Sequence, residues 1–483
     1  MEQKAGAQIS TKVFVQSLVI LFVLMMVAGV LTYVVPAGQY ARVIQDGREI
    51  IDPQSFGLVP RPDYPFWRWF TAPLEVLAGP DSATIIVIIL FILMVGSAFA
   101  VLDRSGILKA AIGRVVNRFG GRKYALLLVI SLLFMAMGAF FGIFEEVVPL
   151  VPLMLALSYS LGWDSLVGLG MSILATNMGF SAAVTNPFTI GVAQKLAGLP
   201  LFSGAWLRVV IFAVLYGVLA LFLVRYAKKI DRHPEASLVY GEDQAARAKY
   251  VAIQVDAAPE EERRFGKAIA WFLAFLVLIV AVLVAGPLVP ALSQVSLPIV
   301  GLLFLIGGIG AGMVAGTRGR AMWRAVGQGL AGIAPSIPLI LMAASVKHIV
   351  AQGGIMDTIL HGASGALGQM SPFVAVLAVY LLALLIEFFI ASGSAKAFLV
   401  MPILFPLADL VGLTRQTTVT AYCFGDGFSN LAYPTNPVLL ICLGLTVVSY
   451  GRWMRWTARL WAVVFVITVA FLALTVAIGF GPF

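Results

Sequence analysis

Two copies of the tripeptide Thr-Asn-Pro interrupt long apolar segments of this chain, in "VTNPF" at 184–188 and in "PTNPV" at 434–438. A proline inside a helix removes one backbone donor and clashes with the carbonyl group four residues earlier. In hydrocarbon, each backbone group freed in this way is costly unless the protein itself satisfies it. A chain that breaks two apolar helices alike is therefore expected to place both breaks in its interior, beside a cavity.

The apolar composition predicts a membrane protein. Of the 483 residues, 61% are hydrophobic and 11% are charged, whereas soluble proteins carry roughly 25% charged residues. Apolar runs of about 20 residues, the length that crosses a bilayer, recur along the chain. The first run, 13–35, leads into Pro36 without a cleavage pattern, so we interpret it as a span and not a signal peptide. We predict an all-α polytopic protein of the inner (plasma) membrane.

The net charge of +9 fits a membrane protein better than a nucleic-acid-binding protein. Basic residues such as Arg318, Arg320 and Arg324 fall in segments predicted to be cytoplasmic, as the positive-inside rule expects. This scheme places the amino terminus inside and the carboxyl terminus outside. The two cysteines lie in apolar sequence and the three histidines are scattered, so no disulfide framework or metal-ligand spacing is present. We expect lipid as a partner, no nucleic acid, and no cofactor beyond a coupling ion.

The apolar runs divide into plain and interrupted segments. Plain spans are predicted at 13–35, 82–101, 205–225, 267–287, 296–316, 331–350 and 457–480. Interrupted segments predict two re-entrant hairpins, 124–160 and 372–410, and two broken helices, 165–197 and 414–444. The remaining segments are polar (36–81), amphipathic (103–123 and 354–369) or charged (226–266). The charged segment is interpreted as a cytoplasmic linker between two membrane halves, 1–225 and 267–483.

The two halves share elements in the same order. Pro187 and Pro437 are 250 residues apart, and the same offset relates Pro152 to Pro402. "GFS" at 179–181 recurs at 427–429, with a slip of two residues. The predicted orientation makes the second half run opposite to the first through the membrane. Such an inverted repeat is typical of secondary transporters, whose substrate site lies near the bilayer midplane where broken helices meet.

The broken helices supply the first candidate site residues. Half-helix starts expose N–H groups that favour a carboxylate, and unwound carbonyls with Thr and Asn oxygens can hold Na⁺. The candidates are Asn177, Ser181, Thr185 and Asn186 in the first broken helix, and Asp426, Asn430, Thr435 and Asn436 in the second, with possible Na⁺ near Asn186 and Asn436. Serine and threonine also serve simply as packing residues in membrane helices. Asp426 is expensive to bury, so it predicts either a functional group or a structural ion pair.

The hairpin tips supply the other candidates. The first tip carries Glu145 and Glu146, and the second carries Ser392, Gly393, Ser394 and Lys396, shortly after Glu387. A glycine-rich tip allows backbone to approach a ligand closely. An ion pair between Glu146 and Lys396 is the alternative interpretation of these charges, and it also brings the tips together.

Three stretches carry a family resemblance over nearly the whole chain. "FGIFEEVVPLVP", "SGSAKAFLVMPILFPLADLVG" and "FGDGFSNLAYPTNP" resemble the YfcC-like branch of the DcuC family, which is named for anaerobic carriers of four-carbon dicarboxylates and belongs to the ion transporter superfamily. The resemblance implies a homodimer with a scaffold domain and a transport domain that moves as an elevator. Better-known dicarboxylate carriers of the superfamily have a Ser-Asn-Thr tip where this chain has Glu145 and Glu146. Some relatives in this branch are described as basic amino acid antiporters.

The charges of the candidate site favour a substrate with an ammonium group. Three glutamates, at 145, 146 and 387, join Asp426 against the single Lys396, which leaves the site net negative if all are ionised. We therefore predict a secondary active transporter of a small carboxylate-bearing metabolite, a basic or zwitterionic amino acid, with a C4-dicarboxylate carrier as the alternative. A channel is less favoured because channels usually form their pore by oligomeric symmetry. An enzyme using "SGSAK" as a Ser-Lys dyad lacks any accompanying catalytic pattern. Coupling to Na⁺, to H⁺, or to exchange alone stays open.

Overall fold

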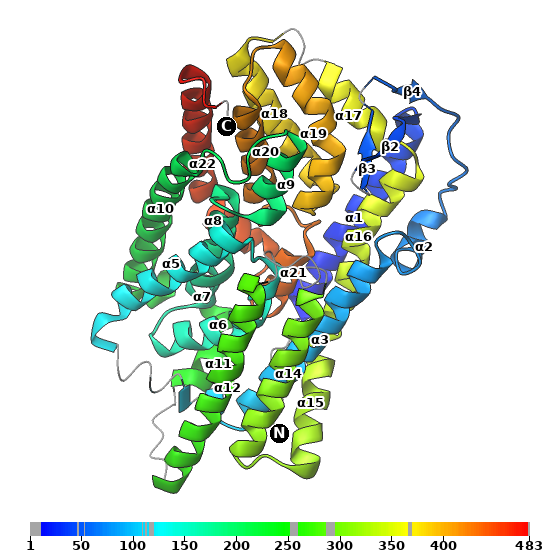
Figure 1. Ribbon diagram of the computed structural model, residues 1–483. Coiled ribbons are helices and arrows are strands. Elements are labelled where there is room, and N and C mark those ends of the chain that lie inside the picture. Colours follow the sequence, from blue (N-terminus) through cyan, green and yellow to red (C-terminus); the bar gives the residue numbers. More distant parts are fainter. Residues whose placement is uncertain are drawn as a thin grey trace.

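The computed structural model describes residues 11–45, 48–52, 54–108, 110–111, 114, 120–251, 259–285, 295–365 and 370–481. Over these residues the chain is mostly helical (Figure 1). Six described stretches are long and apolar enough to cross a membrane: Ile85–Arg104, Lys123–Phe141, Ser165–Ala182, Ala205–Arg232, Gly319–Gln352 and Tyr450–Ala477. Shorter apolar helices accompany them. The prediction of a polytopic helical membrane protein is confirmed.

The first half of the chain contains the following ten helical elements. These are α1 (Thr11–Val34), α2 (Arg68–Glu75), α3 (Ser82–Arg104), α5 (Lys123–Phe141), η2 (Glu145–Leu150), α6 (Val151–Ser160), α7 (Ser165–Leu169), α8 (Ala175–Ala182), α9 (Val192–Leu196) and α10 (Ala205–Arg232). Short 3-10 turns lie at η1 (Gly120–Arg122) and η5 (Pro234–Ala236), and π-turns at η3 (Gly170–Leu174) and η4 (Pro187–Gly191).

The second half follows a helix of the predicted linker, α11 (Tyr240–Val251). It contains α12 (Pro259–Ala285), α14 (Ser296–Val314), α15 (Gly319–Ile333), α16 (Ser336–Gln352), α17 (Met356–Gly365), α18 (Pro372–Glu387), α19 (Gly393–Leu410), α20 (Arg415–Ser429), α21 (Pro437–Gly444) and α22 (Tyr450–Ala477). The predicted domain boundaries at 225 and 266 fall inside α10 and α12.

Both predicted broken helices are interrupted at the Thr-Asn-Pro motifs. α8 ends at Ala182, and Ala183 adopts a left-handed conformation with φ of 46°. The helix resumes at Pro187, and in the second copy α20 ends at Ser429 and α21 begins at Pro437. In both cases asparagine is the N-cap and proline takes the first helical position, where its missing N–H costs nothing. The motif therefore starts a half-helix as well as ending one.

The predicted hairpins are interrupted at their expected tips. α5 ends at Phe141, where Gly142 is left-handed with φ of 68°, and the chain turns into η2 and α6. α18 ends at Glu387 and α19 begins at Gly393. The four interrupted segments pack together, α5 on α8, α18 on α20, and α8 on α20.

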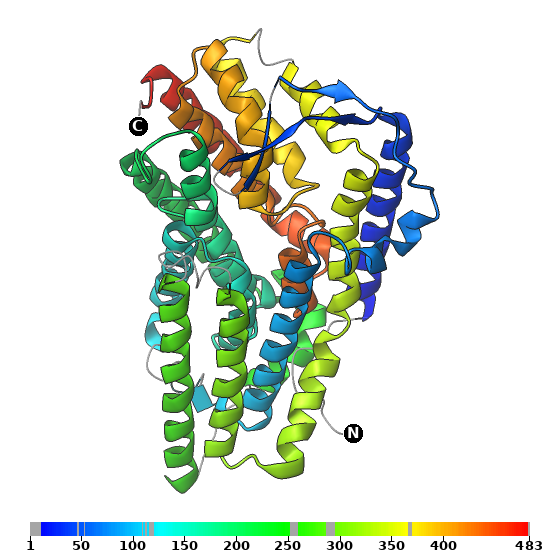
Figure 2. The ribbon, with the colours of Figure 1, turned by 45° about the vertical axis from the view of Figure 1, so that its right-hand side comes forward.

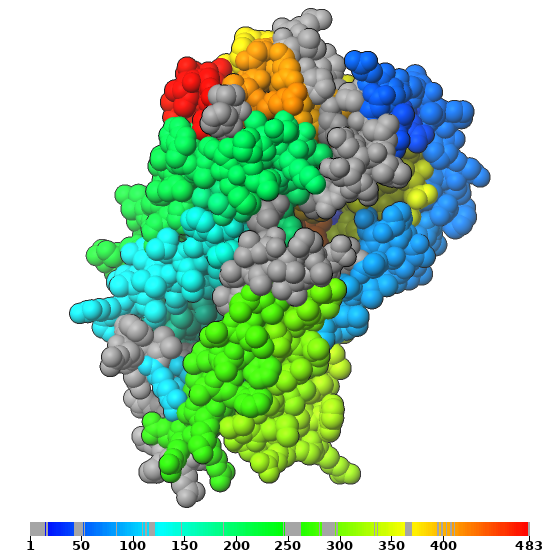
Figure 3. All heavy atoms as spheres, in the orientation of Figure 1, coloured from blue at the N-terminus to red at the C-terminus, as the bar shows by residue number. Residues whose placement is uncertain are grey.

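A second group of helices packs beside them. α3 contacts α14 and α15, α12 contacts α14, and α1 contacts α16. In Figures 1 and 2, α12, α14 and α15 form the lower part of the molecule, while α18, α19 and α22 reach the opposite end. Figure 3 shows α12, α14 and α15 as a continuous green to yellow-green lobe at the lower end.

The segment 36–81 contains β-strands, which the all-α prediction did not include. It contains β1 (Gly38–Gln39) paired antiparallel with β4 (Gly57–Leu58), and β2 (Arg42–Gln45) paired antiparallel with β3 (Arg48–Ile51). Asp357 of α17 anchors this segment, because its carboxylate accepts hydrogen bonds from Tyr40 N at 3.0 Å and from Arg42 at 2.9 Å. The strands lie near α17 at the upper end of the molecule (Figure 1). The all-α prediction is thus corrected by two short antiparallel ladders.

The predicted span 331–350 lies within the apolar stretch Gly319–Gln352, which contains a break between two helices. α15 ends at Ile333 and α16 begins at Ser336, with Pro335 as the N-cap residue. Pro335 cannot donate a backbone hydrogen bond, and this explains why the helix is interrupted at this residue.

The predicted linker is largely helical and part of it is docked. Asp243 of α11 is fully buried, and its carboxylate accepts hydrogen bonds from Tyr159 Oη at 2.8 Å and Ser165 N at 2.7 Å. The linker therefore packs on α6 and α7. The amphipathic stretch 103–123 lies partly outside the described residues, and α17 covers most of the stretch predicted at 354–369.

Candidate functional site

The second hairpin and the second broken helix meet at a buried group of three charges. Lys396 of α19 has a fully buried side chain, and its ammonium pairs with the Glu387 carboxylate at the end of α18. The same nitrogen lies 2.8 Å from Oδ1 of Asp426, in the last turn of α20. Both carboxylate side chains are 1% exposed. One ammonium thus lies between two carboxylates from different segments, which is a substantial concentration of charge at membrane depth.

Several oxygens of this group remain without hydrogen bonds. Among the described residues, Glu387 Oε1 and Asp426 Oδ2 have no hydrogen-bond partner, and Asp426 Oδ1 has only its ion pair with Lys396. Thr435 Oγ1, Thr189 Oγ1 and the amide of Asn177 are also buried without hydrogen-bond partners in the described part of the chain. Buried polar atoms are nearly always hydrogen-bonded, so unpaired atoms on the second hairpin and on both broken helices point to a bound ligand, ion or water.

The tip of the second hairpin touches both broken helices. A Cβ atom at Gly393 would lie 2.9 Å from Asp426 Oδ2 and 2.8 Å from Thr189 Cγ2. The hydroxyl of Tyr422 donates a hydrogen bond to the Gly393 carbonyl, and the Tyr422 ring lies 5.9 Å from the Lys396 ammonium. Only glycine allows this close approach, which is to side chains of the two broken helices. A contact of Gly393 with a ligand stays a prediction.

A cavity of about 180 Å³ lies next to this group. Its described lining combines both hairpin tips, through Glu145 and Ser392, with the start of α21, through Asn436 and Val438, and with α3. The Glu145 side chain is exposed to this space, and it is close enough to Asp426 to interact electrostatically. The amino end of α21, which carries partial positive charge, borders the same cavity. Positive and negative groups therefore face one small volume.

The two asparagines of the Thr-Asn-Pro motifs act as helix caps. Asn186 Oδ1 accepts hydrogen bonds from Phe188 N and Thr189 N, at 2.9 and 3.3 Å. Asn436 Oδ1 accepts one from Val438 N at 3.0 Å, while its Nδ2 donates to Asn430 Oδ1 at 2.8 Å. These oxygens hold the half-helix starts in place, which limits their freedom to coordinate Na⁺ directly.

Two other candidates make contacts within the protein. Thr185 ties the first break to α5, with its Oγ1 donating to the Phe140 carbonyl at 2.9 Å. Ser181 Oγ donates to the Asn177 carbonyl at 2.7 Å within α8. Both hydroxyl groups thus donate to backbone carbonyls of the protein, in agreement with the packing interpretation of serine and threonine.

The alternative prediction paired Glu146 with Lys396, but the structure gives Lys396 other partners. Lys396 pairs with Glu387 and Asp426, because α18 and α20 bring those two carboxylates to its ammonium. The side chains of Glu146 and Ser394 lie outside the described residues. The alternative of a structural ion pair at Asp426 is confirmed in its geometry.

Sequence analysis missed Arg208 of α10. Its side chain is 2% exposed, and it donates hydrogen bonds to the carbonyls of Val184, Ser203 and Phe202 at 3.1, 2.9 and 3.0 Å. The Val184 carbonyl belongs to the unwound stretch of the first broken helix. The available signal was an arginine near the start of the apolar run 205–225, far from the basic end of that run at Arg225, because a charge inside such a run needs a buried partner.

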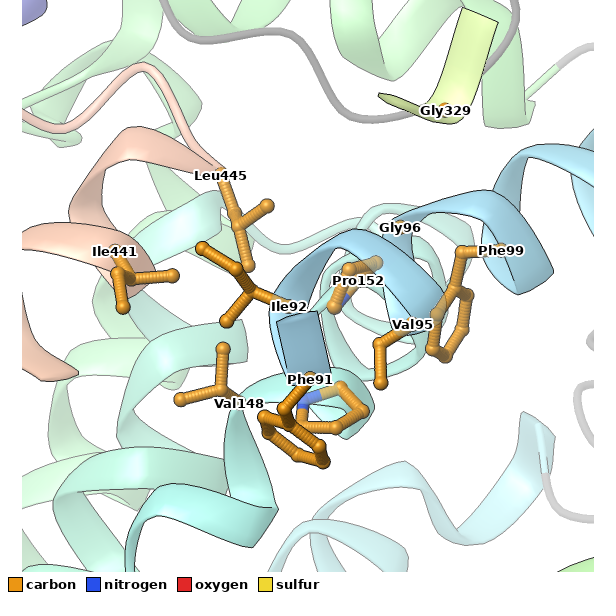
Figure 4. A pocket seen from close by; sticks show the side chains of 11 residues that line it. Phe91, Ile92, Val95, Gly96, Phe99, Val148, Pro152, Gly329, Ile441 and Leu445 are labelled. Carbon is orange, nitrogen blue, oxygen red and sulfur yellow. The ribbon is translucent and has the colours of Figure 1, made fainter. Parts of the chain in front are cut away.

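An apolar seam lies between α3 and the segments that carry the site. Phe91, Ile92 and Val95 of α3 face Val148 and Ile441 across a small void of about 20 Å³. Figure 4 shows these apolar side chains of α3 opposite those of η2, α6 and α21. This surface contributes packing with few directional bonds.

Comparison with known proteins decides the family. The profile of the family described as C4-dicarboxylate anaerobic carrier, DcuC, matches residues 14–477. The chain belongs to the DcuC family. Its relatives include a protein of Escherichia coli K12 named "Putative basic amino acid antiporter YfcC", 30% identical over 94% of both chains. An uncharacterized protein of Haemophilus influenzae is 27% identical, over 76% of this chain and 71% of its own length.

This DcuC family member is a membrane transporter and not an enzyme, as predicted. Among solved structures, that of the YdaH transporter of Alcanivorax borkumensis, described as having an unusual topology, aligns with 97% of this chain and 98% of its own. The alignment has 19% sequence identity and a TM-score of 0.41.

Proposed function

We propose that this DcuC family member is a secondary transporter that exchanges amino acids, with basic amino acids as preferred substrates. The observation that carries the proposal is the excess of carboxylates around the cavity. Glu145 lines the cavity, and Glu387 and Asp426 lie buried beside it against the single ammonium of Lys396. A dicarboxylate would add two negative charges to this site, whereas an arginine or lysine would reduce its net charge.

The substrate would lie with its two ends on opposite charges. Its carboxylate would face the start of α21, where the helix dipole favours an anion. Its cationic end would face Glu145. The cavity of about 180 Å³ is small, so binding would need the hairpin tips to adjust around the side chain of the substrate.

Alternating access would follow an elevator motion in the proposed scheme. The interrupted segments would move as one transport domain along α3, α14 and α16, and the inverted repeat predicted from sequence would relate the inward and outward positions. The apolar seam between α3 and the segments η2, α6 and α21 supports such sliding, because its contacts are not directional. A homodimer is expected to hold the scaffold helices still in the membrane.

Direct binding tests the substrate class. We expect purified protein in detergent to bind radiolabelled arginine in a scintillation proximity assay, with displacement by unlabelled lysine and not by succinate. Displacement of arginine by succinate at similar concentrations would favour the dicarboxylate named in the family description. Absence of arginine binding together with binding of labelled succinate would overturn the proposal.

A further inference from the structure

We propose that Lys396 is a tethered counter-cation that occupies the place of a transported coupling ion, so that this protein exchanges substrates without Na⁺. The inference rests on the proposed function for its transport consequence, but its structural part can be tested without any substrate. It begins from the position of the ammonium group. Lys396 is the fourth residue of α19, where the partial positive charge of a helix start disfavours a cation.

The carboxylates therefore determine where the ammonium lies. Glu387 and Asp426 approach it from α18 and α20, and all three side chains are at most 1% exposed. Transporters hold Na⁺ or H⁺ at the carboxyl ends of interrupted helices. Glu387 is the last residue of α18, and Asp426 lies in the last turn of α20, so the ammonium takes such a position. Here the cation is covalently attached to the chain and cannot dissociate.

Lys396 is separate from the cavity that would hold the substrate. The described lining of that cavity includes Glu145, Ser392 and Asn436, and Lys396 is not among the lining residues. The ammonium is directed at carboxylates and lies 5.9 Å from the Tyr422 ring. These contacts indicate that Lys396 joins the second hairpin to α20 and does not contact a substrate carboxylate.

The charge balance then determines the transport cycle. Moving an uncompensated charge through the membrane interior is costly. Lys396 can neutralise only one of its two carboxylate partners, and Glu145 is a further carboxyl group near Asp426. A bound cationic amino acid would reduce this excess, whereas the empty site would retain it. The loaded transport domain would cross and the empty one would not, which makes exchange obligatory.

The transport test compares ions and preloading. In proteoliposomes containing unlabelled arginine, labelled arginine uptake should be the same within about twofold when external NaCl is replaced by choline chloride. Uptake into vesicles lacking internal substrate should be at least about tenfold slower. Accumulation in empty vesicles driven by a Na⁺ gradient would overturn the inference while leaving amino acid transport intact.

A substrate-free test addresses the tethered cation itself. The Lys396→Ala variant removes a propylammonium group, so its thermal unfolding temperature in detergent should rise when propylammonium chloride or NaCl replaces choline chloride, because a ligand that binds only the folded state stabilises it. Wild-type protein and Lys347→Ala, which removes a partly exposed lysine paired with Asp81, should show no such rise. A Lys396→Ala variant that is purified folded and stabilised by neither cation would contradict the assignment, even if arginine transport is confirmed. If arginine is not a substrate but this stabilisation is observed, only the proposed function fails.

Discussion

Gly427 of α20 and Ser181 of α8 lie against each other where the two broken helices cross. A Cβ atom added at Gly427 would lie 2.4 Å from Ser181 Cα and 2.5 Å from its Oγ. Gly427 begins the second "GFS" motif and Ser181 ends the first, so the repeated motif provides the contact between the two copies. Since the obstacle is partly backbone, a side chain at 427 cannot be accommodated by a rotamer change.

Replacing Gly427 by alanine should therefore separate the broken helices. We expect at least about a tenfold loss of arginine exchange and a loss of stability of about 1–3 kcal/mol, the usual cost of overpacking. The matched control is Gly217→Ala in α10, where a Cβ atom would meet nothing within 4 Å. Its transport rate should match that of wild type. Equal rates and unfolding temperatures for both variants would show that the crossing tolerates expansion.

Removing the charge of Glu145 should weaken the binding of cationic substrates specifically. Glu145→Gln is expected to raise the KM for arginine roughly 10- to 100-fold, the range of a lost hydrogen bond to a charged group. A neutral amino acid, if transported, should be affected much less. Glu235→Gln, which changes an exposed carboxylate beside His233, is the control. Unchanged KM for arginine in Glu145→Gln would remove Glu145 from the binding site.

Arg208 should be essential to the first break and not replaceable by lysine. The guanidinium group binds three carbonyls in fixed directions, which a single ammonium cannot reproduce. Arg208→Lys is expected to reduce stability by about 2–3 kcal/mol and to slow exchange, measured by thermal unfolding and proteoliposome uptake. Arg225→Lys, at an exposed position of the same helix, should have neither effect. Equal behaviour of the two variants would contradict the structural role of Arg208.

The docked linker helix should make stability depend on pH. Burial raises the pKa of Asp243 to about 6 from its ordinary 3.8. The folded state thus keeps a proton between these values that the unfolded state has lost, so this carboxyl group makes stability fall as pH rises from about 4 to about 6 and stay level above. The full effect is on the order of 3 kcal/mol.

Thermal unfolding at intervals from about pH 4.5 to about pH 7.5 tests this dependence. Asp243→Asn should flatten the fall relative to wild type, because an amide does not titrate in this range. Asp52→Asn, a change at a partly exposed residue directly after β3, should leave the wild-type profile intact. A profile that Asp243→Asn does not alter would show that α11 is docked independently of this carboxyl group.

The sequence predicts the features that depend on neighbouring residues. Asn186 with Pro187, and Asn436 with Pro437, encode an N-cap followed by a first helical residue, so both breaks could be located. Pro335 is a similar signal for the end of α15. It was overlooked because the run 331–350 is apolar and long enough to be taken for one uninterrupted span. The helical spans follow from hydropathy alone.

Tertiary contacts could not be predicted in the same way. Glu146 and Glu387 are both glutamates near a hairpin tip, and only the arrangement of α18, α19 and α20 assigns Lys396 to Glu387 and Asp426. Asp243 resembles an ordinary linker carboxylate until Ser165 and Tyr159 surround it. The short strands of 38–58 lie in polar sequence, where alternation is too brief to indicate pairing.

The most direct test of the central claim is counterflow by purified protein in proteoliposomes, with vesicles preloaded with unlabelled arginine and labelled arginine or labelled succinate outside. A carboxylate-rich site with a fixed lysine predicts rapid arginine counterflow that needs internal arginine and is not inhibited by external succinate. Rapid counterflow of succinate in vesicles preloaded with succinate, with arginine inert in both directions, would contradict it.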